Sequence, residues 1–201
     1  NIQRWNDHIR PQGFTELDKQ AHKMMILYIL AKYEEQDHGA QLNWRALIEG
    51  GIFEFMHRII LTDIKPPIYH ELMRVHGRKL NAWIYSQLAR RVPELDKVFF
   101  DKLKRWFDYP EENRLEKKLL RAAHYLATQW EFGIIYHFNQ AIYGIDATKA
   151  AIESNIEDHY DLAGVQKISL KGKTSKFIDL VGQLRFQKRW AQLPRVPETS
   201  V

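Results

Sequence analysis

The sequence predicts an all-α fold, a bundle of about seven to nine helices. Apolar residues recur three and four residues apart in every long segment, which is the period of a helix that buries one face. Prolines and glycines stand between these segments, where helices start and end. Strand-like alternation is confined to residues 164–174, which we expect to form either a loop or a short hairpin arm.

The composition fits one domain with a substantial core, because 45% of the 201 residues are hydrophobic. No apolar run approaches the ~20 residues that cross a bilayer, so we expect a cytoplasmic protein with no membrane partner. Cysteine is absent, so a metal ion would be held by His, Asp or Glu. The net charge of +5 favours an anionic partner. Because the basic residues are interleaved with acidic ones, we do not expect that partner to be nucleic acid.

The first two predicted helices carry recognisable N-terminal caps. Thr15 and Asp18 form a capping pair for a helix over residues 15–35. Asn43 is a suitable N-cap for a second helix over residues 44–61, interrupted only by its two adjacent glycines.

Prolines and glycines divide the middle of the chain into three helices. Pro66 opens a short helix, because the first helical turn does not need the N–H group that proline lacks. Gly77 ends that helix, and two more follow over about residues 79–92 and 93–107.

The longest periodic run covers residues 111–142. Its inward positions are Leu115, Leu119, Leu120, Ala123 and Leu126. Either Asp146 or Thr148 caps another helix that runs toward His159, and a last helix covers residues 175–190.

We expect residues 1–185 to form one helical domain. Residues 186–201 have few apolar side chains, and charges and prolines separate them. We therefore expect this segment to be an extended tail that cannot form a core of its own.

Three histidines lie on the apolar faces of three predicted helices. His22 shares a face with Met25, His57 is flanked by apolar residues, and His124 lies one turn from Leu120. If the helices bring the three imidazoles together, they predict a site for Zn, Mn, Fe or Co. The alternative is three separate core histidines with structural roles.

Charged residues accompany the middle histidine. Glu54 and Asp63 are each a candidate for a fourth metal ligand or for the base that orients a water molecule. Arg58 follows Glu54 by one turn, and it is either a bidentate phosphate ligand or the structural partner of Glu54.

Three further residues are candidates for substrate binding. Lys65 stands before two prolines, where its ammonium group is available to a phosphate oxygen. Arg4 and Trp5 can form a charged stacking platform for a nucleotide. The alternative for Trp5 is that it only covers the end of the first helix.

The order of these features resembles the HD-domain superfamily of metal-dependent phosphohydrolases, in particular its bacterial 5'-deoxynucleotidase-like branch. The similar landmarks span nearly the whole chain: Arg4-Trp5, His22, Leu61-Thr62-Asp63-Ile64, Pro66-Pro67, and Arg121-Ala122-Ala123 before His124. The resemblance implies an HD-domain-like bundle, a divalent metal ion (Zn, Mn, Co, Fe or Mg), and hydrolysis of a nucleotide or related phosphate ester.

Two positions depart from the family pattern. The adjacent His-Asp pair is absent, since His57 is followed by Arg58, and His124 stands where the family has its last Asp. A guanidinium group in place of a carboxylate would repel a metal ion. The metal site is therefore either rebuilt from His22, Glu54 or His57, and His124, or lost.

The tail repeats the start of the chain. Arg189-Trp190 and Arg195 match Arg4-Trp5 and Arg10 at a common offset of 185 residues. In proteins similar to this one, such a segment is the entry to a second HD domain. We therefore predict that the chain is the N-terminal, diverged copy of a tandem HD protein.

The resemblance implies a phosphohydrolase with three groups of site residues: His22, His57 and His124 as metal ligands, Glu54 and Asp63 as catalytic residues, and Arg4, Trp5 and Lys65 as substrate-binding residues. The alternative is a non-catalytic structural or regulatory module that packs on an active HD domain. The expected partners are a small phosphate ester or nucleotide, the second HD domain of the same protein, and a second copy of the chain in a homodimer.

Overall fold

The computed structural model describes residues 2–10, 13–62, 64 and 66–169. These residues form seven helices and no sheet, which confirms the all-α class. The helices are α1 (Glu16–Asp37), α2 (Trp44–Leu61), α3 (Pro66–Arg91), α4 (Lys97–Asp108), α5 (Arg114–Asn139), α6 (Ile145–Glu157) and α7 (Val165–Ile168).

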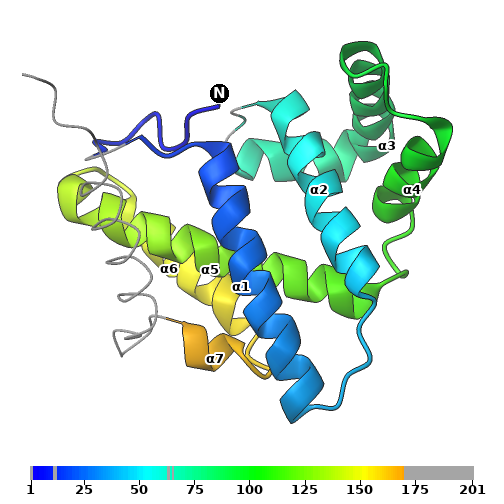
Figure 1. The fold of residues 1–201 in the computed structure, drawn as a ribbon. Helices are drawn as coiled ribbons and strands as arrows, with labels where there is room; N and C mark the ends of the chain where they lie inside the picture. Colours follow the sequence, from blue (N-terminus) through cyan, green and yellow to red (C-terminus); the bar gives the residue numbers. More distant parts are fainter. Residues whose placement is uncertain (1, 11–12, 63, 65, 170–201) are drawn as a thin grey trace, which may run out of the picture.

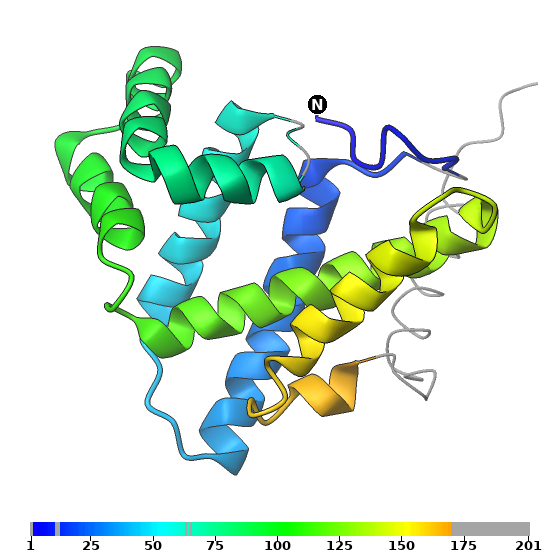
Figure 2. The same cartoon turned by 180° about the vertical axis from the view of Figure 1, so that it is seen from behind.

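Helix α5 lies at the centre of the fold. Figure 1 shows α1 and α2 side by side in front of it, with α3 and α4 beyond α2. Seen from behind in Figure 2, α6 runs along α5, and α7 follows near the far end of α6. Both α1 and α2 therefore bury one face against α5 and leave the opposite face outward.

The predicted caps of the first two helices are confirmed. The Thr15 hydroxyl accepts from the backbone N–H of Asp18, and the Asp18 carboxylate accepts from the Thr15 N–H, which completes a capping box. The Asn43 side chain accepts from the Ala46 N–H. Each cap satisfies a backbone donor that the helix leaves without a partner, so the start of each helix is fixed by local sequence.

Helix α2 continues through its two glycines without interruption, which corrects the prediction. A Cβ atom built on Gly50 would lie 2.4 Å from the Trp106 ring of α4, and one on Gly51 would lie 2.4 Å from the Met24 sulfur of α1. These glycines therefore let α2 approach its two neighbours closely rather than break the helix.

Three other helix boundaries differ from the prediction. Helix α3 continues past Gly77 with only a kink at His76, because the backbone resumes helical geometry after one residue. Gly144, in the left-handed region, precedes α6 in place of the predicted side-chain cap. Val165–Ile168 forms a helical turn, where either a loop or a short hairpin arm was expected.

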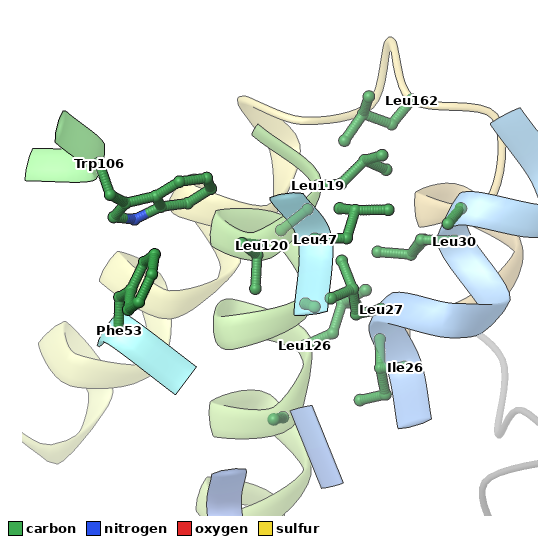
Figure 3. Packing of buried hydrophobic residues seen from close by; sticks show 14 of the residues in the cluster. Ile26, Leu27, Leu30, Leu47, Phe53, Trp106, Leu119, Leu120, Leu126 and Leu162 are labelled. Atoms are coloured by element: carbon green, nitrogen blue, oxygen red, sulfur yellow. The ribbon is translucent and has the colours of Figure 1, made fainter. Parts of the chain in front are cut away.

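Leucines from four elements meet in the core between α1, α2 and α5. Figure 3 shows Leu30 of α1, Leu47 of α2 and Leu119 of α5 packed together, with Leu162 above them. Phe53 and Trp106 extend the same cluster toward α4. Burial of this apolar surface holds the helices together at roughly 25 cal/mol per Å².

The N-terminal segment before α1 is fastened to the end of α5. The Asn139 side chain accepts from the Ile9 N–H and donates to the Ile9 carbonyl, both at 2.8 Å. Within the described part of the chain, no helix is long and apolar enough to span a bilayer. The predicted helix at 175–190 and the tail at 186–201 lie outside the described residues.

Candidate functional site

The buried face of α1 begins with charged side chains. Glu16, Lys19 and Lys23 precede Ile26 and Leu30 on one stripe, with three- and four-residue steps. Lys19 and Lys23 are each only 3% exposed. Because burying a charge without a partner is costly, this stripe requires counter-charges from other elements.

Two carboxylates, those of Glu16 and Glu131, bind the N-terminal segment. The Arg4 guanidinium donates to Glu131 of α5 at 2.9 Å and to Glu16 of α1 at 2.8 Å. The Trp5 indole N–H donates to the same Glu131 oxygen at 3.0 Å. Arg4 and Trp5, predicted to face a substrate, are thus engaged with protein carboxylates.

Charge pairing outweighs burial at Arg4 and Glu16. Burial alone would lower the pKa of Arg4, but Glu131 and Glu16 raise that pKa above its usual value. Burial alone would raise the pKa of Glu16, but Arg4 and Lys19 lower that pKa. Both groups are therefore charged at neutral pH.

His124 faces Lys19 from the neighbouring helix. The Lys19 Nζ lies 3.2 Å from His124 Nε2. Burial lowers the pKa of His124 well below its usual value, and the cations Lys19, Lys23, Arg4 and Arg58 lower it further. The imidazole is therefore neutral at pH 7, and its Nε2 lies within hydrogen-bonding distance of the Lys19 amino group.

The pKa of Lys19 is also well below its usual value. Burial is the main cause, and the nearby Arg4 cation adds to it against the opposite effects of Glu131 and Glu16. The contact between Lys19 and His124 therefore brings together two buried nitrogen bases whose pKa values are both lowered.

Glu54 pairs with Lys23 and not with Arg58. The Lys23 Nζ lies 2.5 Å from a Glu54 oxygen. The Arg58 Nη1 donates to the Ile64 carbonyl at 3.3 Å, and its Nε lies 3.9 Å from Glu16. Among the described residues, Arg58 thus contacts Ile64 and Glu16 and not Glu54, the expected partner.

His57 belongs to a separate polar chain between α2, α3 and α4. Its Nε2 lies 3.0 Å from the Asn81 amide oxygen, and Asn81 in turn donates to Asp108 at 3.4 Å. The ring packs against Phe107 with centroids 4.5 Å apart. Burial lowers the pKa of His57, so this histidine is neutral at pH 7.

His22 lies beside the buried stripe of α1 rather than on it. Its ring contacts Trp130 of α5 edge-on, with centroids 4.9 Å apart. Met25, predicted on the same core face, is 54% exposed and lies outside the buried stripe, whereas Ile26 is buried as predicted. The stripe that is buried passes through Lys19, Lys23 and Ile26.

The described side chains do not fit a divalent metal ion. Within residues 2–10, 13–62, 64 and 66–169, no three His, Asp or Glu side chains are grouped to hold one. His22, His57 and His124 have the different neighbours given above, and Glu54 has an ammonium partner. Their roles as metal ligands remain a prediction. Asp63 and Lys65 lie outside the described residues.

Four important residues were missed at the sequence level: Glu16, Lys19, Lys23 and Glu131. A signal existed for the two lysines, because steps of three and four residues back from Leu30 through Ile26 land on Lys23 and Lys19. Lysines are rarely buried, so the pattern did not predict that the stripe stays buried at these two positions. No local signal marks Glu131, whose partners are more than a hundred residues away.

No protein-family model and no curated protein matches this chain.

Proposed function

We propose that this chain is a non-catalytic HD-like module. Its interior holds a buried ionic network of Arg4, Glu16, Lys19, Lys23 and Glu131 in the place where a family member would hold its metal ion. The contact between Lys19 Nζ and His124 Nε2 carries the proposal. It supports a structural or regulatory role over a catalytic one.

Charge is the physical reason for this choice. A metal ion near His124 would lie beside the Lys19 ammonium group and within reach of Lys23, Arg4 and Arg58, all of which already depress the His124 pKa. Solvent and salt screen charges poorly in the buried interior, so repulsion by these cations disfavours a divalent metal ion near His124.

The test is metal binding and hydrolysis by the 201-residue chain. The protein is stripped with a chelator, dialysed separately against Zn²⁺, Mn²⁺ and Co²⁺, and its metal content is measured by mass spectrometry. Hydrolysis of deoxynucleoside monophosphates is assayed under the same conditions. We expect substoichiometric metal and no turnover above the buffer rate. Stoichiometric metal together with metal-dependent turnover would overturn the proposal.

A second candidate is the HD-type phosphohydrolase itself, which the order of landmarks along the sequence favours. In that case a divalent ion bound by His22, His57 and His124 would supply an activated water. Glu54 or Asp63 would orient that water, and Arg4, Trp5 and Lys65 would face the phosphate ester. Under this proposal His124→Ala abolishes turnover, whereas Lys19→Met leaves metal bound or increases it.

A further inference from the structure

Helix α1 has a second apolar stripe on the side opposite its buried one. Leu17, Ala21, Met25 and Tyr28 recur at steps of three and four residues. Leu17, Met25 and Tyr28 each leave more than half of their surface exposed. A helix that is apolar on two opposite faces is typical of a position between two packed layers.

Helix α2 repeats this arrangement. Ile48, Ile52, Phe55 and Ile59 follow one another at helical spacing on its outward side. Ile48 and Ile52 are about half exposed, and Phe55 and Ile59 are partly buried. The inward side of α2 is occupied by Leu47 and the rest of its buried residues, so the outer stripe has no role in the core.

The two stripes form one surface, which we call the α1–α2 face. Both helices turn their inner sides toward α5 and lie side by side in front of it, so their outer sides face the same way (Figure 1). The Gln20 amide donates to the Gly51 carbonyl at 2.8 Å, and the Tyr28 and Trp44 rings lie 5.6 Å apart. These contacts join the two helices along the edge that the stripes share.

The charges at the rim of the α1–α2 face are nearly balanced. Lys32 pairs with Glu35 at 2.6 Å on α1, and Glu49 on α2 pairs with both Arg45 at 2.8 Å and Lys102 at 2.7 Å. An apolar centre with a polar rim has the composition of a protein–protein interface. A balanced rim also allows the face to meet an identical face, which a strongly single-sign surface would resist.

We propose that the α1–α2 face is the contact between two copies of this chain. A two-fold axis sets the same patch of both copies against itself, so each copy contributes two helices to a four-helix interface. The occupant is a second copy because the rim carries three positive and two negative charges paired with one another, and not the strong charge of one sign that nucleic acid or a highly charged partner would require.

The test is the mass of the 201-residue chain by sedimentation equilibrium over a range of concentrations. We expect a species of about 48 kDa, twice the chain mass of 23.9 kDa. Met25→Glu and Ile52→Glu should each raise the dissociation constant of the dimer about tenfold or more. Both positions are exposed in the single chain, so helix content by circular dichroism should not change.

The matched control is Val75→Glu on α3, an equally exposed apolar position away from this face. It should leave the dissociation constant unchanged. Because the chain has no cysteine, Ala21→Cys and Val75→Cys each introduce the sole thiol. A short thiol-specific crosslinker should give a covalent dimer with Ala21→Cys and not with Val75→Cys. A chain that stays monomeric, or a dimer that Val75→Glu disrupts and Ile52→Glu does not, would overturn the proposal.

Discussion

In the first half of α1 the buried charged side chains are Glu16, Lys19 and Lys23, whereas in the second half Leu27, Leu30 and Ala31 are buried, with Glu34 as the one buried charge near the end of the helix. The two halves lie on one stripe and are buried to a similar depth against the same helix. The apolar half is stabilised by removal of surface from water, which needs no particular partner. The charged half is stable only while each charge keeps its counter-charge.

This difference has a consequence for mutation. Truncating a leucine leaves a cavity, and the surroundings relax around it. Removing one member of the ionic network leaves another charge buried without compensation, which is the more costly defect. The two halves of α1 can therefore be compared experimentally.

The largest expected effect is that of Glu131→Ala. This change removes the shared acceptor of Arg4 and Trp5, and we expect it to lower the free energy of unfolding by about 3–5 kcal/mol. Leu30→Ala in the apolar half is the comparison, with an expected loss of about 2–5 kcal/mol. Urea unfolding of both variants provides the measurement.

A double variant separates the two mechanisms. Arg4→Met combined with Glu131→Leu removes both charges of one pair, so the loss should be clearly smaller than the sum of the single losses. If the double variant loses as much as the sum, the pair is not coupled, and the charged half of α1 behaves like ordinary packing.

The next effect is a dependence of stability on pH. The His124 pKa is depressed in the folded state. Below about pH 6.5, His124 therefore binds a proton in the unfolded chain but not in the folded chain. Stability should therefore fall as pH decreases through this range and level off below the folded-state pKa. Unfolding free energies measured between about pH 5 and 7 would show this slope.

Lys19→Met sharpens this prediction. The nearest cation is removed while burial remains, so the His124 pKa should rise but stay below its usual value. The acid loss of stability attributable to His124 should then be smaller than in the parent chain. Proton NMR titration of His124 in both proteins tests this, and an unchanged titration midpoint would show that Lys19 does not act on the imidazole.

A smaller effect is expected at the start of α1. Thr15→Ala removes one half of the capping box, and we expect a loss of about 1 kcal/mol. Thr15→Ser keeps the hydroxyl and serves as the matched control. Thermal unfolding of both variants gives the comparison, and equal losses would mean that the methyl group rather than the cap is responsible.

The smallest effect is expected at an exposed ion pair. Arg105 donates two hydrogen bonds to Glu112 on the surface, at 2.6 and 2.8 Å. Solvent and salt screen this pair, so Glu112→Gln should not change the unfolding free energy measurably. A loss comparable to that of Glu131→Ala would show that burial does not explain the difference between the two pairs.

The parts of the fold that sequence could predict are those with local signals. The capping residues Thr15 and Asn43 act within three residues of themselves, and the starts of α1 and α2 were predicted correctly. The kinked continuation of α3 past Gly77 was not predicted, because a glycine can end a helix or pass through it depending on tertiary packing.

Local sequence patterns could not predict the ionic network, because its partners are far apart in the sequence. Lys19 and His124 are 105 residues apart, and Arg4 and Glu131 are 127 apart. Periodicity assigns a face to each side chain but not the partner it meets there. The periodicity therefore placed His57 and His124 on buried helix faces, but it could not predict that Lys19 meets His124 there.

The attachment of the N-terminal segment to α5 has a consequence for biosynthesis. Arg4, Trp5 and Ile9 are synthesised more than a hundred residues before their hydrogen-bond partners Glu131 and Asn139. Such distant contacts close large loops and form slowly. Throughout that interval the nascent α1 carries its lysines without their carboxylate on α5 and its leucines without their core. Until α5 has been translated, the emerging chain therefore exposes apolar side chains that the finished fold buries.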